Sequence, residues 1–365
     1  MKKILTIGGA MQDIFIQYKA VETLHMHAKQ EDSAYICMRA GRKIDVQDVV
    51  YYCGGGATNS AVSFARCGLN VETFFKIGND HAGDFIRETL KSEHISTAHV
   101  ICTENAATGT SFIIPGPHGN SAILVHRGAN ITLTEQEIPH DAIQTVDQLY
   151  ITSLSGPAAS LLIPIAQYAK KYNKNVAANP GTSQLLAGAD FLKTALSHID
   201  TLILNSYEAE LLMTSLMVKI PHLEIDQKDD IFVPELLRKP MGSATTCFTL
   251  VQFFKAVHNC GPTTIVVTNG AEGVYVCDGA TIYFHPSIHI NMVSSVGAGD
   301  AFGSCFVAQR LHGTSIEDAL RAGIINSSSV IKHLGTQTGL LTQEQLEKHG
   351  EHLDKNLLRK FNLKE

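Results

Sequence analysis

Residues 293–304, Val-Ser-Ser-Val-Gly-Ala-Gly-Asp-Ala-Phe-Gly-Ser, decide the fold, because a glycine loop passes there directly into a helical pattern. Gly297 and Gly299 lack a Cβ, so the backbone can take positive φ and a ligand can approach it closely. The free N–H groups at the start of the helix point back at the same place, where the helix dipole favours an anion. Asp300 stands in the first helical turn, where a carboxylate can take a proton from a hydroxyl while the amides stabilise negative charge.

The helix that follows this loop is predicted to have one apolar face. Ala301, Cys305, Ala308 and Leu311 recur at i, i+4, i+7 and i+10, the spacing of an amphipathic helix. For this segment alone a second interpretation stays open, in which Asp300 only complements the helix dipole. Other parts of the sequence are needed to distinguish a catalytic base from a partner of the helix dipole at Asp300.

The composition is that of an ordinary globular protein. Of 365 residues, 44% are hydrophobic and 18% are charged, which suits one large domain or one with a small appendage. Because the net charge is −6 and no basic run occurs, nucleic acid is not an expected partner. The N-terminal apolar run stops at Gly8, too early for a signal peptide, and no run has the length of a membrane span. We therefore expect a cytoplasmic protein.

Cysteine and histidine usage gives no signature of a metal site or a disulfide framework. The eight cysteines lack CxxC spacing and fall mostly in apolar runs, so we interpret them as reduced packing residues. The 17 histidines show no HExxH spacing, so a metal held by histidine is not expected.

The second half of the chain alternates strands with helices. The predicted elements up to residue 214 are strand 147–152, helix 158–172, strand 175–178, helix 188–197, strand 201–204 and helix 206–214. After an irregular insertion at 215–243 come helix 245–258, strand 263–268, a β pair at 273–277 and 280–285, and helices 298–311, 315–332 and 342–352. This order predicts the α/β class, with a parallel sheet between two helical layers and ligand sites at the carboxyl ends of the strands.

The first half interrupts this pattern with short β segments. The elements expected in the main body are strand 4–9, helix 57–67, strand 71–78 and helix 80–90. Residues 14–53 alternate short apolar and polar patches, and 99–102, 109–115 and 121–126 also read as strands. We expect these segments to build a small β sheet outside the main body.

Five short elements each end or follow a predicted strand: Asp13, Gly54–Asn59, Asn205–Glu208, Thr268–Gly273 and Gly297–Asp300. Motifs of P-loop, dinucleotide-binding, serine-hydrolase and protein-kinase sites do not occur in the sequence. In order and spacing the five elements resemble the ribokinase-like (PfkB) family of carbohydrate and nucleoside kinases, over nearly the whole chain. The resemblance implies one kinase domain over 1–365, a three-layer α/β/α fold with a mostly parallel sheet, and a β-sheet lid from 14–53 and 103–127.

The resemblance also implies catalytic roles for the glycine loop. Asp300 becomes the general base toward an acceptor hydroxyl, and Gly297, Ala298 and Gly299 supply amides as an anion hole for the γ-phosphoryl group of ATP. Glu208 of the Asn-x-x-Glu element organises Mg²⁺ through its water shell. Taken alone, Glu208 is equally well explained as an exposed first-turn glutamate.

Binding roles follow from the same resemblance. Nucleotide contacts are expected from Asn205, Thr268, Gly270, Gly273 and Asn326. Acceptor hydroxyls are expected to contact Asp13, Gly55, Gly56, Asn59 and Asn179. Each element has a local alternative, since Thr-x-Gly-x-x-Gly also describes a strand-to-hairpin turn and Asn179 precedes a proline that favours a turn.

Two departures from the family pattern stand out. Many members have an Asp that helps to hold a monovalent cation where this sequence has Ser294, so a tight site for such an ion is not expected. The insertion at 215–243 is longer than the family usually has.

The acceptor is left open by the sequence. Arg127-Gly128-Ala129-Asn130 resembles sugar kinases such as ribokinase, whereas residues 52–59 and 322–336 look as much like adenosine kinases. The leading expectation is an ATP- and Mg²⁺-dependent phosphotransferase acting on a hydroxymethyl group of a sugar, with a nucleoside kinase as the alternative. A non-catalytic sugar or nucleotide sensor is the rival from another class. Phe15, Tyr35 and Ile36 in the lid would build either a base slot or a contact between two lids, which allows a homodimer.

Overall fold

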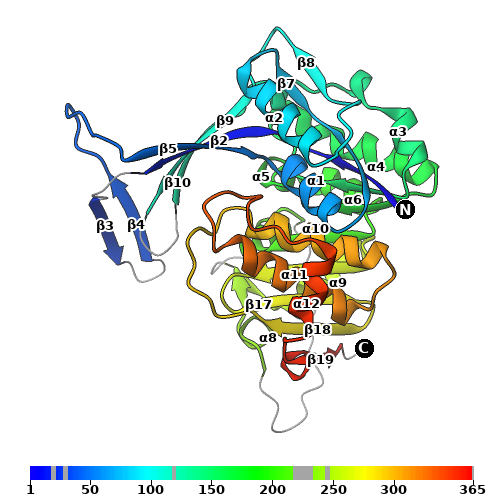
Figure 1. Ribbon diagram of the computed structural model, residues 1–365. Helices are drawn as coiled ribbons and strands as arrows, with labels where there is room; N and C mark the ends of the chain where they lie inside the picture. Colours follow the sequence, from blue (N-terminus) through cyan, green and yellow to red (C-terminus); the bar gives the residue numbers. More distant parts are fainter. Residues whose placement is uncertain (18–21, 28–31, 117–120, 217–232, 243–246, 364–365) are drawn as a thin grey trace.

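The computed structural model describes residues 1–17, 22–27, 32–116, 121–216, 233–242 and 247–363. Its centre is a nine-stranded sheet, shown with its helices in Figure 1. The strands in spatial order are β6 (Asn70–Phe74), β1 (Lys3–Ile7), β11 (Gln148–Ile151), β12 (Asn175–Ala178), β13 (Thr201–Asn205), β16 (Thr264–Asn269), β17 (Gly273–Asp278), β18 (Thr281–Pro286) and β19 (Arg359–Asn362). Neighbours from β6 to β16 are parallel and those from β16 to β19 antiparallel, which confirms a mostly parallel sheet.

Helices cover both faces of this sheet and give three layers. One face carries α3 (His140–Thr145), α4 (Leu162–Lys171), α6 (Ala189–Leu196), α7 (Ser206–Leu216) and α9 (Leu250–His258). The other carries α1 (Gly56–Arg66), α2 (His81–Ser92), α10 (Ala298–Leu311), α11 (Ile316–Val330) and α12 (Gln343–Gly350). Side chains of a strand alternate between faces, so Leu5 joins one buried cluster and Ile4 the other.

Helix α10 is buried on every side along most of its length. Each residue from 301 to 309 is buried, because α10 packs against both α1 and α11. The expectation of a single apolar face is therefore wrong. A helix enclosed in this way needs small side chains where its neighbours approach, and Gly303 shows this, since a Cβ there would lie 2.6 Å from the Tyr150 hydroxyl.

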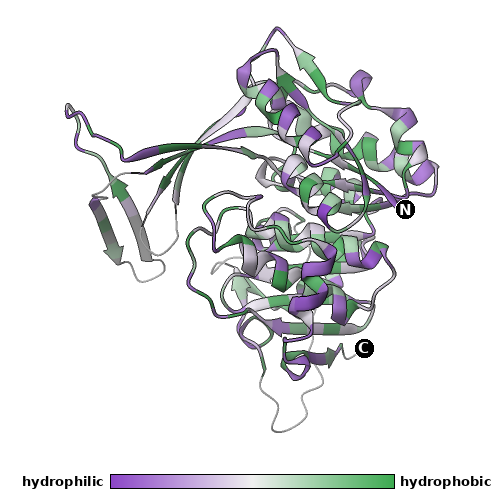
Figure 2. Cartoon of the chain, viewed as in Figure 1, coloured by the Kyte–Doolittle hydropathy of each residue, from purple (hydrophilic) through white to green (hydrophobic). Residues whose placement is uncertain are grey.

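A second, four-stranded sheet projects from the main body (Figure 1). Its order is β10 (Ser121–His126), β9 (Gly109–Pro115), β2 (Met11–Gln17) and β5 (Asp48–Gly54), and the hairpin β3 (Glu22–His27) with β4 (Asp32–Cys37) lies beyond it. Apolar residues colour much of the projecting strands in Figure 2, and Tyr51, Ile123 and Leu124 are exposed there.

One strand expected in this small sheet lies elsewhere. The segment predicted at 99–102 is β8 (Ile101–Thr103), which pairs in parallel with β7 (Lys76–Gly78) on the main body. The backbone N–H of Ile101 bonds to the carbonyl of Phe75, 3.0 Å away, which ties β8 to the chain that leaves β6. The pattern of apolar residues identified a strand but carried no information on its partner.

The insertion predicted at 215–243 falls largely on residues 217–232, which lie outside the described residues. The described part of the insertion contains α8 (Glu235–Arg238) and β14 (Met241–Gly242), which pairs with β15 (Cys247–Phe248) after it. The helix predicted from 245 begins at 250, because Thr249 caps it by accepting a bond from the Gln252 N–H.

The cysteines fit the expectation only in part. All eight are free thiols, and Cys53, Cys67, Cys277 and Cys305 are buried, but Cys37, Cys102 and Cys247 are exposed and do not pack in the core. Among the described residues, no helix has the length and apolar character that a membrane crossing requires.

Candidate active site

Glycines and asparagines occupy the positions where the strands of the main sheet end. Strand β1 leads to Gly8 and Gly9, β12 leads to Asn179, and β13 and β16 end in Asn205 and Asn269. Between β1 and β11 the chain reverses the direction in which strands are added, since β6 lies on one side of β1 and β11 to β16 on the other. Such a reversal point opens a crevice at the carboxyl edge of the sheet.

The glycine loop places the N-terminus of α10 at the carboxyl ends of β12, β13 and β16, where Gly297 and Gly299 line a cavity with Asn179, Asn205 and Thr268. Gly297 is the N-cap, with φ 84° and ψ −3°, and a Cβ there would lie 2.8 Å from the Cβ of Thr336. No side chain caps the helix among the described residues, but the Ala298 N–H donates to the Ser295 carbonyl at 3.3 Å, so a ligand would bond chiefly to the neighbouring amides of the first turn. A Cβ on Gly299 would meet no atom within 4 Å, because this residue faces two cavities.

Asp300 stands on the wall of the smaller cavity. This cavity, of about 200 Å³, is also lined by Asn179, Asn205, Glu208 and Thr268. The Asp300 carboxylate accepts a 2.8 Å hydrogen bond from the side-chain amide of Asn59. Burial raises the pKa of Asp300 above its ordinary value, and the bond from Asn59 opposes that rise. A carboxylate of raised pKa beside open helix amides can accept a proton where an anion is held.

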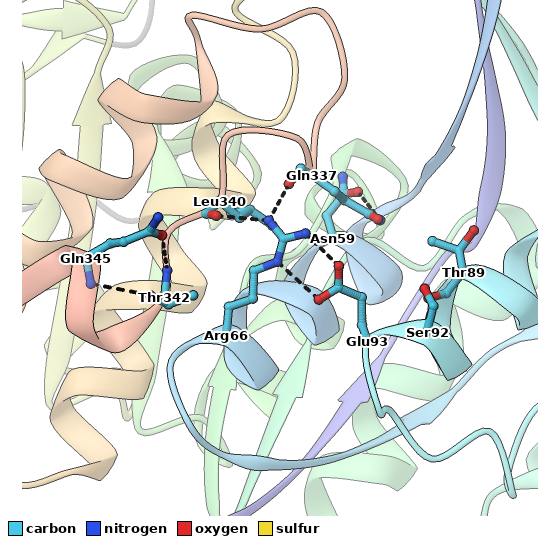
Figure 3. Close-up of polar contacts among 9 residues, drawn as sticks. All are labelled: Asn59, Arg66, Thr89, Ser92, Glu93, Gln337, Leu340, Thr342 and Gln345. Atoms are coloured by element: carbon cyan, nitrogen blue, oxygen red, sulfur yellow. Dashed lines mark hydrogen bonds and ion pairs between the residues drawn. The ribbon is translucent and has the colours of Figure 1, made fainter.

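Asn59 is held firmly by its neighbours. Its amide oxygen accepts hydrogen bonds from the Thr336 hydroxyl at 2.9 Å and the Gln337 side-chain amide at 3.1 Å (Figure 3 shows the latter contact). These two bonds fix which end of the amide is the donor, so the NH₂ group points at Asp300. The sequence suggested a hydroxyl-binding role, and the structure adds a contact with the predicted base.

Asp13 lies in β2, an inner strand of the small sheet, and is buried. The hydroxyl of Ser111 in β9 donates a short hydrogen bond to its carboxylate. Burial raises the pKa of Asp13 to about 6, the bond from Ser111 opposes that rise, and the charge of Asp300 adds to it. The charge effect of Asp300 indicates that the two carboxylates face the same region.

The glycine triplet has a packing reason that the sequence did not reveal. A Cβ on Gly54 would lie 1.9 Å from an oxygen of Asp13, and one on Gly56 would lie 2.6 Å from the Thr152 hydroxyl. Gly55 has φ 98°, and its Cβ would lie 2.5 Å from the carbonyl oxygen of Gly9. The triplet therefore lets β5 and α1 approach Asp13 and the end of β1.

The Asn-x-x-Glu element forms a reciprocal helix cap. The Asn205 N–H donates to the Glu208 carboxylate at 2.9 Å, and the Glu208 N–H donates to the Asn205 side-chain oxygen at 2.8 Å. Burial raises the pKa of Glu208, the bond from Asn205 lowers it, and the charge of Asp300 raises it further. Asn179 donates to the Ile203 carbonyl at 2.9 Å and lines the same cavity.

The larger cavity, of about 550 Å³, lies on the other side of the glycine loop. Thr268, Gly270 and Gly273 line it at the turn between β16 and β17, and Gly299 is shared with the smaller cavity. Gly273 has φ 139°, and a Cβ there would lie 2.3 Å from the His285 carbonyl oxygen. Apolar walls come from Ile288, Ile290, Phe302 and Ile324, so one end of the cavity suits a flat apolar group and the other an anion.

Asn326 does not contribute to either cavity. It is fully buried, its amide donates to the Ala301 carbonyl at 2.9 Å, and its oxygen accepts from the Leu341 N–H at 2.9 Å. Its expected contact with the nucleotide is therefore not supported, because both ends of the amide are used inside the protein. The neighbouring Ile324 and Ser327 line the larger cavity instead.

Three contributors to the site were missed in the sequence. Ser111, Thr336 and Gln337 come from β9 and from the segment after α11, and each bonds to Asp13 or Asn59. No local pattern marks these residues, because their partners lie 98 to 278 positions away in the chain.

Known proteins are similar to this chain in sequence and in fold. The family model for the pfkB family carbohydrate kinases matches residues 25–343. The ribokinase of Staphylococcus aureus is 28% identical over 84% of this chain and 91% of its own, and the nucleoside kinase of Methanothermobacter thermautotrophicus is 23% identical over 79% and 81%.

Solved structures agree on the fold. The structure of Arabidopsis thaliana ribokinase complexed with ribose and ATP superposes with a TM-score of 0.72 at 18% identity, covering 96% of this chain and 99% of that one. The Methanocaldococcus jannaschii nucleoside kinase gives the same TM-score over 97% and 99% at 18% identity. This chain is therefore a member of the pfkB carbohydrate kinase family, with the ribokinase fold, and its class is that of ATP-dependent sugar or nucleoside kinases.

Proposed function

We propose that this protein transfers the γ-phosphoryl group of ATP to a hydroxymethyl group of a sugar. The observation that carries the proposal is the position of Asp300, in the first turn of α10 and on the wall of the smaller cavity, directly after Gly299, which lines both cavities. The larger cavity has the volume and apolar wall for a nucleotide, and Asn179, an expected acceptor contact, lines the smaller one beside Asp300.

In this mechanism Asp300 takes the proton of the acceptor hydroxyl as its oxygen attacks the γ-phosphorus. The bond from that phosphorus to the bridging oxygen of ADP breaks at the same time, and ADP leaves with the electron pair. Amides of residues 297–299 stabilise the charge on the transferring group. Phosphoryl transfer is catalysed mainly by such positioning and electrostatic stabilisation. Burial that raises the pKa of Asp300 makes its carboxylate a stronger base.

Glu208 is the residue that we expect to hold Mg²⁺. One carboxylate oxygen bonds to the Asn205 N–H, and the side chain lines the same cavity as Asp300. Glu208 would hold such an ion largely through its water shell, which suits the small, strongly hydrated Mg²⁺. When bound, Mg²⁺ neutralises phosphate charge.

A sugar is the favoured acceptor. Ribokinases from several organisms are among the relatives of this chain. Phe15, a candidate wall for a nucleoside base, is fully buried and packs edge-on against Tyr52 with ring centroids 5.4 Å apart. Tyr35 is half exposed on the outer hairpin. A nucleoside kinase is the second candidate, on the similarity to the archaeal nucleoside kinase.

An ADP-release assay tests the proposal. The purified protein is given ATP and Mg²⁺ with ribose, fructose 6-phosphate, 2-keto-3-deoxygluconate, adenosine, guanosine or inosine in turn. Turnover with a sugar is expected, and turnover with nucleosides alone would favour the second candidate. Tight binding of one compound without turnover of any would favour a sensor.

A further inference from the structure

Arg66 joins three segments of the chain at the back of the site. It lies in the last turn of α1, and its guanidinium forms a two-point pair with Glu93, with N···O distances of 3.1 and 2.6 Å. Another guanidinium nitrogen donates to the backbone carbonyls of Gln337 and Leu340, each at 2.9 Å (Figure 3). Both side chains of the pair are about a quarter exposed, so water screens it only in part.

The two carbonyls belong to the same segment that orients Asn59. Within residues 335–341, Thr336 and Gln337 donate to the Asn59 amide oxygen, and Asn59 donates to Asp300. Thr336 also packs against Gly297, the N-cap of α10. A continuous chain of hydrogen bonds therefore runs from Glu93 and Arg66 through this segment to Asn59 and Asp300.

We propose that Arg66, held by Glu93, acts as a positioning residue that clamps residues 335–341 and thereby fixes Asn59 against the Asp300 base. The inference rests on the proposed function of Asp300. Arginine is required, because a planar guanidinium can bond to a carboxylate at two points and to two carbonyls at once. Lysine has a single nitrogen and cannot span these acceptors.

The clamp predicts a change at Asp300, which Arg66 does not touch. The bond from Asn59 favours the ionised carboxylate and so opposes the rise in pKa that burial causes. When residues 335–341 are released, Asn59 loses its two anchors and donates less well to Asp300. The pKa of Asp300 then rises further, and the acid limb of the kcat–pH profile moves to higher pH because the base must be ionised.

Steady-state kinetics of four variants test the clamp. Arg66→Gln removes both sets of bonds, Arg66→Lys keeps only the charge, and Glu93→Gln weakens the anchor of the guanidinium. We expect kcat to fall roughly tenfold for Arg66→Gln, since misplacement by 1 Å can cost about 10²-fold, with a smaller loss for Glu93→Gln. The KM for ATP should change little. Arg87→Gln is the matched control, because Arg87 pairs with Asp84 at 2.6 Å on the exposed side of α2.

A double-mutant cycle with Asn59→Ala decides whether Arg66 acts through Asn59. If it does, Arg66→Gln lowers kcat far less in the Asn59→Ala background than in the wild type. Equal losses in both backgrounds would overturn the proposal. So would an Arg66→Lys variant that keeps the wild-type kcat and pH profile.

A spectroscopic titration keeps the test independent of turnover. The Asp300 carboxyl signal of ¹³C-aspartate-labelled protein is identified by its loss in Asp300→Asn, and its midpoint should move to higher pH in Arg66→Gln and not in Arg87→Gln. An unmoved midpoint in folded Arg66→Gln protein refutes the clamp, whatever the substrate. If Asp300→Asn retains activity, the proposed function fails separately. Should Arg66→Gln unfold, the titration is made on Glu93→Gln, which keeps the arginine but weakens its anchor, and a smaller shift of the midpoint to higher pH is expected.

Discussion

Asp300 is the residue on which the proposed chemistry depends. Asp300→Asn keeps the shape of the side chain and removes the base, so kcat should fall by roughly 10²–10⁴-fold. Nucleotide affinity should change little, because the larger cavity is lined by other residues. Asp84→Asn, on the exposed side of α2, is the control. A variant with wild-type kcat would show that Asp300 is only a partner of the helix dipole.

Asp13 gives the acceptor side its own pH dependence. Its pKa is about 6, so its carboxylate is ionised above that pH and protonated below it. An ionised carboxylate accepts hydrogen bonds from two hydroxyls, so kcat/KM for the acceptor should fall as the pH drops below about 6. Ser111→Ala removes a bond that lowers this pKa and should move the fall to higher pH. An unchanged profile in Ser111→Ala would contradict this account.

At the scale of elements, the strands and helices of the main body followed from the sequence because their apolar periods are long and regular. The partner of β8 and the enclosure of α10 did not follow, since both depend on segments distant in the chain. The glycine loop was identified from its own residues, whereas the residues that orient Asn59 were not. A local sequence pattern predicts the backbone conformation and the buried face of an element. It does not predict which distant hydroxyl or amide bonds to that element.

The sequence also did not reveal the contacts of Asn326, and these contacts can be tested. Its amide joins α10 to the chain after residue 340, through Ala301 and Leu341. Asn326→Ala leaves a buried carbonyl and a buried N–H without this partner, each at a cost of about 1–3 kcal/mol. We expect a clearly lower Tm with an unchanged KM for ATP, and no effect of Asn105→Ala, which alters an exposed loop. A raised KM for ATP at unchanged Tm would instead support the contact between Asn326 and the nucleotide that the sequence predicted.

The loop before Gly297 bears on cation dependence. Ser294 is buried, and its hydroxyl accepts a 3.3 Å bond from the Val296 N–H. The Ile331 carbonyl accepts N–H bonds from both Val293 and Ser294, which leaves it poorly placed to bind an ion. Activity should therefore depend little on K⁺, and Ser294→Asp should increase that dependence. Assays in which tetramethylammonium replaces K⁺ at constant ionic strength check this, and a large loss in the wild type would contradict it.

At the scale of the whole molecule, the chain passes directly from the small sheet into the candidate site. Strand β5 ends at Gly54 and α1 begins at Gly56, so a single residue separates the sheet from the helix that carries Asn59. Asp13 lies in β2 of the same sheet. Any movement of this sheet therefore moves acceptor-side residues, which is the behaviour we expect of a lid that excludes water on closure.

The exposed face of the small sheet predicts association of two copies. Leu124 is 62% exposed and Tyr51 53%. The strand pairing joins them on one face of the sheet through Phe112, which is 39% exposed, and Ile14. Strands β10 and β5 are its outer members, and unpaired sheet edges and exposed apolar faces favour pairing. We expect a homodimer by analytical ultracentrifugation, and Leu124→Glu should shift it toward monomer because a charge would be buried. Leu186→Glu, an exposed leucine of the main body, is the control. A monomer at every concentration would exclude the dimer and leave the proposed kinase activity standing.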